Sequence, residues 1–131
     1  MVNVETGEKK AFLRQNGEFD SEKIGRFSIC REGLEMGRTI LKSTTGSIVV
    51  IDEVGMLEIC DRGWAPYIDE HLATPGKLFL FSVRNSYLEE VKRKWNLEDA
   101  VIFEAGKTSY QDAGIAILNA LPKPKAGGNI I

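Results

Sequence analysis

Two adjacent carboxylates, Asp52 and Glu53, directly follow the apolar run 48–51. A carboxylate beside an apolar core needs a cation or hydrogen-bond donors to stay ionised, so acids at this position are costly unless something uses them. One interpretation is a Mg²⁺ site in which Asp52 holds the ion and Glu53 orients or deprotonates an attacking water molecule. The other is structural: Asp52 caps the following turn and Glu53 is solvated. The pair of residues alone leaves both interpretations open.

Polar residues also follow two later apolar runs. In an open parallel sheet, ligands bind beyond the carboxyl ends of the strands, which makes these residues candidates as well. Arg84 is placed to reach a phosphate, although an arginine at such a position pairs more often with a surface carboxylate. Gly106-Lys107-Thr108 is too short a fragment to indicate a phosphate-binding loop, and Thr108 or Ser109 is better explained as the cap of the last helix.

The elements that would position these residues follow an α/β pattern. Short continuous apolar runs predict strands buried on both faces of a parallel sheet, and apolar residues between the runs recur at helical spacing. Alternating strands and helices predict right-handed crossovers, hence three layers with a mainly parallel sheet, preceded by a short antiparallel hairpin region at the N-terminus. The expected strands are 48–51, 78–81 and 101–103; the expected helices are 32–42, 64–72, one opened by a Ser86–Glu89 capping box, and 109–121.

Composition limits the kind of protein. Lys and Arg number 17 against 19 Asp and Glu, and the net charge of -2 offers no overall attraction to nucleic acid or to an acidic membrane. His71 is the only histidine, which excludes multi-histidine zinc sites. The sequence has neither a signal-peptide pattern nor an apolar stretch of membrane-spanning length, so the expected location is cytoplasmic. Its 131 residues predict one domain over 1–121 and a flexible C-terminal tail over 122–131.

The string Ile48-Val-Val-Ile-Asp-Glu-Val-Gly-Met-Leu-Glu58 has the form of a Walker B strand end. It resembles the Asp-Glu-x-Gly-x-Met/Leu-Glu segment of the thermophile-type nucleoside-triphosphatase family, small P-loop proteins related to nucleotide kinases. The resemblance extends loosely over most of residues 1–121. It implies a P-loop NTPase-like fold and Mg²⁺-dependent hydrolysis of the terminal phosphate of ATP or GTP. On this basis Asp52 is the metal ligand, Glu53 the catalytic residue and Arg84 a weaker candidate for binding the nucleotide.

The chain departs from that family in one respect. Family members begin with a strand and a G-x-x-x-x-G-K-[ST] loop, whose backbone N–H groups and lysine cradle the phosphates, and the printed sequence contains no such loop. In the family's sheet the missing strand lies between the counterparts of 78–83 and 101–103, so its absence would leave buried backbone groups unpaired.

Three arrangements would close this gap. The two strands pair directly, a second chain or copy inserts a strand, or the natural gene product extends upstream and Met1 is a truncated start. The predicted function is therefore an Mg²⁺-dependent nucleoside-triphosphatase-like domain that is inactive or weak alone. The alternative is a non-catalytic nucleotide-sensing or protein-interaction module with a degenerate NTPase fold. A third, less favoured, is a receiver-like or other doubly wound domain.

Overall fold

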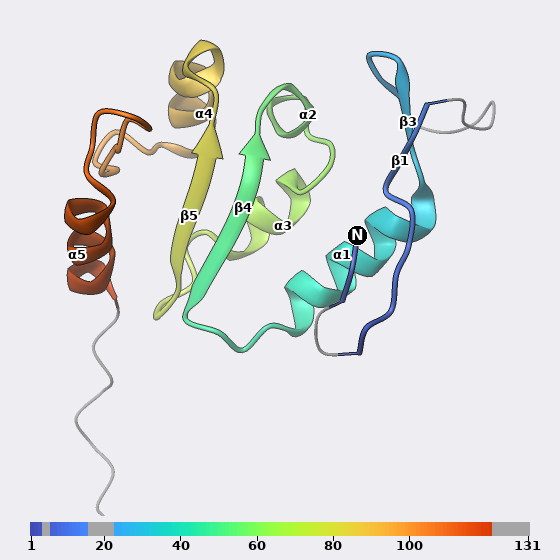
Figure 1. Ribbon diagram of the computed structural model, residues 1–131, viewed down its shortest axis with the longest axis horizontal. Helices are drawn as coiled ribbons and strands as arrows, with labels where there is room; N and C mark the ends of the chain where they lie inside the picture. Colours follow the sequence, from blue (N-terminus) through green and yellow to red (C-terminus); the bar gives the residue numbers. More distant parts are fainter. Residues whose placement is uncertain (4–5, 16–22, 122–131) are drawn as a thin grey trace, which may run out of the picture. The chain divides into compact units, whose positions relative to one another are not determined.

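The computed structural model describes residues 1–3, 6–15 and 23–121, which form two compact units of mixed α/β structure (Figure 1). Unit 1 comprises Met1–Thr45 and Met56–Glu70, and unit 2 comprises Gly46–Gly55 and the chain from His71 onward. An antiparallel sheet and a separate parallel sheet account for the strands of the described residues. The predicted tail 122–131 lies outside the described residues, and a single domain over 1–121 stays a prediction.

The N-terminal region forms a three-stranded antiparallel sheet in the order β1-β3-β2, which confirms the predicted hairpin region. Its strands are β1 (Leu13–Arg14), β2 (Lys23–Ile24) and β3 (Phe27–Ile29). The sequence did not predict β2. It pairs with β3 through the tight turn at Gly25-Arg26, where Gly25 has a φ of 55°, as the favoured two-residue hairpin turns require.

Three helices complete unit 1, except that the last residue of the third helix, His71, belongs to unit 2. Helix α1 (Arg31–Ser43) coincides with the predicted helix 32–42, and α3 (Ala65–His71) lies within the predicted helix 64–72. The short α2 (Met56–Ile59) precedes α3 and contains Glu58, which is buried and accepts a hydrogen bond from the backbone N–H of Trp64 at 3.3 Å. Glu58 therefore has a structural task in the connection between α2 and α3. The ring of Trp64 stacks on that of Phe12 at 5.5 Å.

Two parallel strands, β4 (Ile48–Val54) and β5 (Leu78–Val83), lie side by side in unit 2 and point the same way (Figure 1). The prediction that the first of them is buried on both faces is wrong. Val49, Ile51 and Val54 are buried, whereas Ile48 and Val50 are 40% and 65% exposed. This strand therefore has one covered face and one exposed face, because the described residues place no layer over Ile48 and Val50.

After β5 the chain forms a 3₁₀ turn, η1 (Asn85–Tyr87), and then α4 (Leu88–Trp95). The predicted Ser86–Glu89 capping box is wrong: the N-cap of α4 is Tyr87, which makes no side-chain capping bond. The 3₁₀ turn replaces the cap, since the Leu88 N–H is bonded to the Asn85 carbonyl. Trp95 of α4 is buried and lies 6.2 Å from the ring of Phe81, so the helix packs on β5 as the crossover pattern requires.

Lys92, in the basic stretch of α4, is paired with two acids of the same region. Lys92 lies 3.3 Å from a carboxylate oxygen of Glu98 and 3.7 Å from one of Glu89. The hydrogen bond to Glu98, together with the negative charge of Glu89, raises the pKa of Lys92 above its ordinary value.

Residues 101–103 do not form the predicted strand. Val101, Ile102 and Phe103 are 73%, 51% and 37% exposed, and in the described residues no strand pairs with them. Their side chains suit a strand, but a strand forms only where a neighbour accepts its backbone hydrogen bonds. Direct pairing of β5 with 101–103, one of the three arrangements considered above, is therefore not what the chain adopts.

The last helix, α5 (Tyr110–Ala120), is present as predicted and begins at the predicted cap. The Ser109 hydroxyl accepts hydrogen bonds from the N–H groups of Gln111 and Asp112 at 3.2 and 3.4 Å. Within the described residues α5 buries no side chain, and Ile115 and Leu118 are exposed. None of the helices in these residues is long and apolar enough to cross a membrane.

Ser109 and Ser86 offer a direct test of which cap is real. Ser109→Ala is expected to lower the free energy of unfolding by about 1 kcal/mol, because two helix N–H groups lose their acceptor. Ser86→Ala is the matched control and should change it by less than about 0.5 kcal/mol, since Ser86 caps nothing. Urea unfolding followed by circular dichroism measures both. Equal losses for the two variants would mean that Ser86 caps α4 after all.

Candidate active site

The register between β4 and β5 slips at the acid pair. Asp52 and Glu53, predicted to follow the strand, lie inside β4 near its carboxyl end. Two residues of β4 here stand opposite one residue of β5, Ser82, which is the definition of a β-bulge. The paired positions on either side are Ile51 with Phe81 and Val54 with Val83.

The bulge determines which way the acids face. Side chains alternate along a strand, so without an extra residue Glu53 would follow Val49 and Ile51 onto the covered side. With the extra residue, Val54 takes that covered position at 1% exposure, and both acids stay exposed. Glu53 has a φ of 60°, in the left-handed region that residues with a side chain seldom adopt. The exposure of two consecutive acids is thus obtained at some cost in backbone strain.

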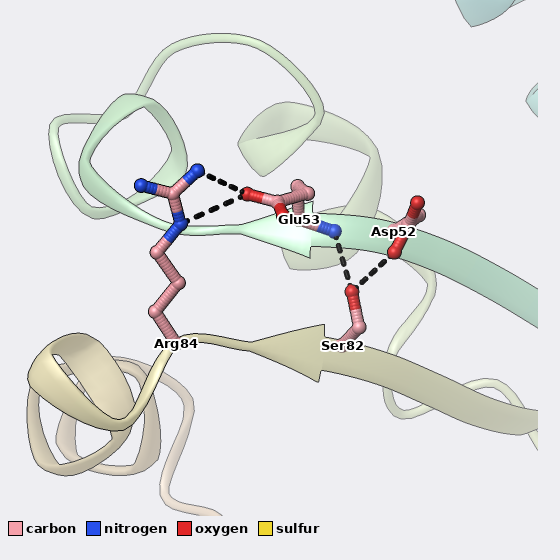
Figure 2. Close-up of polar contacts among 4 residues, drawn as sticks. All are labelled: Asp52, Glu53, Ser82 and Arg84. Carbon is pink, nitrogen blue, oxygen red and sulfur yellow. Dashed lines mark hydrogen bonds and ion pairs between the residues drawn. The ribbon is translucent and has the colours of Figure 1, made fainter. Parts of the chain in front are cut away.

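Ser82 of β5 connects the two acids (Figure 2). Its oxygen accepts a hydrogen bond from the backbone N–H of Glu53 at 2.7 Å, and its hydroxyl donates to Oδ1 of Asp52. Sequence reasoning did not single out Ser82. The available signal was a polar residue at the carboxyl end of an apolar strand, next to the strand that carries the acids.

Arg84 lies just beyond β5, and its guanidinium points toward Glu53 (Figure 2). Its Nε and Nη2 donate to the same oxygen, Oε2, at 3.1 and 2.9 Å. Both side chains are largely exposed, at 70% for Arg84 and 63% for Glu53. The structure thus brings together Asp52, Glu53 and Arg84. Of the two roles expected of Arg84, phosphate binding and pairing with a carboxylate, it shows the second.

Each acid keeps one oxygen available for a ligand. Among the described residues, Oδ2 of Asp52 and Oε1 of Glu53 accept no hydrogen bond. In the same part of the chain no group of at least three His, Cys, Asp or Glu could enclose a metal ion. Mg²⁺ usually binds through one or two carboxylates together with ligand phosphates and water, whereas dedicated protein cages suit other ions. These donors therefore fit a magnesium ion that is shared with a phosphate ligand.

Residues 104–108, which follow the exposed segment 101–103, contact one another in the described part of the chain. The ammonium of Lys107 pairs with Glu104 at 2.8 Å, and the Thr108 hydroxyl accepts a hydrogen bond from the Glu104 N–H at 3.2 Å. The polar groups of this turn are thus bonded to one another, and the turn lacks the glycine-rich backbone that binds phosphates. The interpretation of Gly106-Lys107-Thr108 as a chance fragment agrees with this geometry.

Comparison with known proteins gives one match. No curated protein and no solved structure matches the chain. A protein-family model described as NTPase matches residues 1–111, which include all of β5 and all of β4 with its acid pair. The match indicates a nucleoside-triphosphatase-like function with a nucleotide substrate, and such enzymes typically use a divalent metal. By this match, and as the string 48–58 predicted, the chain belongs to the NTPase family.

Proposed function

We propose that this chain, as one P-loop NTPase-like domain over residues 1–121, handles the metal ion and the attacking water in hydrolysis of ATP or GTP. Asp52 would hold Mg²⁺ and Glu53 would act on the water. The observation that carries the proposal is the bulge in β4. It keeps two consecutive carboxylates exposed at the carboxyl end of a parallel strand, each with one oxygen available.

The neighbours of the two acids support different roles for them. Asp52 contacts the neutral hydroxyl of Ser82, so its full negative charge is available to a cation. Glu53 already faces the positive charge of Arg84, which repels a second cation. Oε1 of Glu53 remains able to accept a hydrogen bond, and then a proton, from water. Mg²⁺, when bound, supplies charge neutralisation at the terminal phosphates.

Arg84 would exchange partners when the nucleotide binds. An exposed ion pair such as Arg84–Glu53 contributes at most about 1 kcal/mol, so breaking it costs little. A terminal phosphate carries more charge than a carboxylate and suits the two-pronged donor geometry of a guanidinium. Transfer of Arg84 to the phosphate would leave both oxygens of Glu53 available to the attacking water. Phosphate binding and activation of Glu53 would therefore be coupled.

The phosphate loop would come from outside the printed sequence, which contains no G-x-x-x-x-G-K-[ST] string. Three features of unit 2 favour an additional strand: β5 has no second neighbour among the described residues, 101–103 is exposed, and α5 buries nothing. A second chain, another copy or an upstream segment would supply that strand together with the loop. The printed chain alone would then be weakly active at most, because the main phosphate ligands are missing.

A second candidate is a module that binds nucleotide or a partner protein without hydrolysing anything. The observation in its favour is the same absence of a phosphate loop from the 131 residues. The two candidates differ in one measurable respect: release of inorganic phosphate. A non-catalytic module would bind the nucleotide but release no inorganic phosphate from it.

Titration with fluorescent ATP or GTP analogues, in Mg²⁺ and then in EDTA, tests the proposal. Nucleotide affinity is expected to fall by about 10-fold, or ~1.4 kcal/mol, when the metal is removed, because the triphosphate and the acids then repel each other. The matching nucleoside monophosphates serve as the control and should show little dependence on Mg²⁺. Nucleotide binding that is equal with and without the metal would contradict the role of the acid pair.

A further inference from the structure

We infer that Ser82 is the positioning residue of the acid pair: its hydroxyl holds the bulge in β4 and thereby sets the affinity of Asp52 for a divalent ion. The part concerning the ion rests on the proposed function. The part concerning the bulge rests on the contacts of Ser82 alone.

The direction of the hydrogen bonds follows from the chemistry of a hydroxyl. A serine hydroxyl has one proton to donate and lone pairs that accept. The backbone N–H of Glu53 can only donate, and it does so to Oγ of Ser82 at 2.7 Å. The single proton of Ser82 is therefore directed to Oδ1 of Asp52. One side chain of β5 thus orients the carboxylate of the first acid and the backbone of the second.

The hydroxyl of Ser82 supplies a hydrogen-bond acceptor that the bulge takes from the backbone of Glu53. A β-bulge leaves its extra residue without a ladder partner, and an N–H without an acceptor is costly. Glu53 carries the additional strain of a φ of 60°. Ser82 supplies the missing acceptor, so the bulged register is favoured over the regular one. In the regular register Glu53 would occupy the covered side of β4, and the two acids would no longer be exposed together.

The same contact prepares Asp52 for a cation. With Oδ1 fixed by Ser82, the carboxylate has one orientation, and Oδ2 is left for the ion. Partners that orient a metal ligand in this way typically affect metal affinity by about 10-fold or more when removed. Threonine should replace serine, because it keeps the hydroxyl and suits a strand, and position 82 is exposed enough to take the extra methyl group.

Two measurements on the same variants test the inference. The first is amide hydrogen exchange of Glu53 by NMR, which reports the bond to Ser82 whether or not a metal binds. The second is Mn²⁺ affinity, from the EPR signal of the free ion. Ser82→Ala should accelerate the Glu53 exchange and weaken Mn²⁺ binding, each by about 10-fold. Ser82→Thr should restore both, and Ser86→Ala, an exposed serine of η1, should behave as the wild type.

The outcomes separate the inference from the proposed function. A Glu53 amide that exchanges rapidly in the wild type overturns the inference directly, even if Ser82→Ala fails to fold. So does Mn²⁺ affinity that is equal in wild type, Ser82→Ala and Ser82→Thr. If the wild type binds no Mn²⁺ while Glu53 exchange depends on Ser82, the metal role of Asp52 and the link of Ser82 to it are both refuted. The role of Ser82 in holding the bulge then stands alone.

Discussion

Asp52→Asn is expected to reduce Mn²⁺ or Mg²⁺ affinity by at least about 30-fold. A divalent ion about 4 Å from a carboxylate charge gains about 2 kcal/mol even in bulk water, and more near a protein surface. Asparagine keeps the size of the side chain and can still accept the hydrogen bond from Ser82, so the bulge should survive. Calorimetric titration with MgCl₂, with and without a nucleoside triphosphate, measures the loss.

Two further variants make this result specific. Asp99→Asn removes the same charge from an exposed residue that has no hydrogen bond or ion pair among the described residues, and it should leave ion affinity within about 2-fold. Glu53→Gln should keep most of the ion affinity but abolish phosphate release wherever the complete site is assembled. If Asp52→Asn and Asp99→Asn weaken binding equally, the ion responds to the general charge of the chain and has no ligand at Asp52.

Four of the helices, α1, α3, α4 and α5, could be predicted because helices depend on local patterns. Apolar residues at helical spacing located α1 and α3, and the hydroxyl of Ser109 marked the start of α5. The segment 101–103 has an equally clear strand pattern and yet forms no strand. A helix makes its backbone hydrogen bonds within itself, whereas a strand needs a neighbouring strand. The sequence of one segment does not show whether that neighbour is present.

The same distinction explains what could be predicted of the site. The position of Asp52 and Glu53 at a strand end followed from an apolar run and two acids. The bulge could not be predicted, because it is a property of the register between two strands, and register depends on both. Ser82 and the pairing of Arg84 with Glu53 depend on that register. Both contacts exist only because β4 and β5 lie side by side in this register.

Gly33→Ala is expected to lower the free energy of unfolding by about 1–2 kcal/mol. A Cβ atom at this position of α1 would lie 2.2 Å from the carbonyl oxygen of Ala11, a backbone atom that cannot rotate away. The segment is also held in place, since the Phe12 carbonyl accepts a hydrogen bond from the Cys30 N–H at 2.8 Å. Overpacking of this kind costs about 1–3 kcal/mol or more, which outweighs the gain of about 1 kcal/mol from alanine in a helix.

The control for Gly33→Ala is the same substitution in α5. A Cβ atom at Gly114 would meet nothing within 4 Å, so Gly114→Ala should stabilise the protein by up to about 1 kcal/mol. Urea unfolding followed by helical circular dichroism should therefore give opposite signs for two identical changes inside helices. The sign depends only on what surrounds each glycine: backbone at Gly33, open space at Gly114. A gain of stability at both positions would mean that α1 does not pack against the backbone of Ala11, and the packing described for unit 1 would have to be revised.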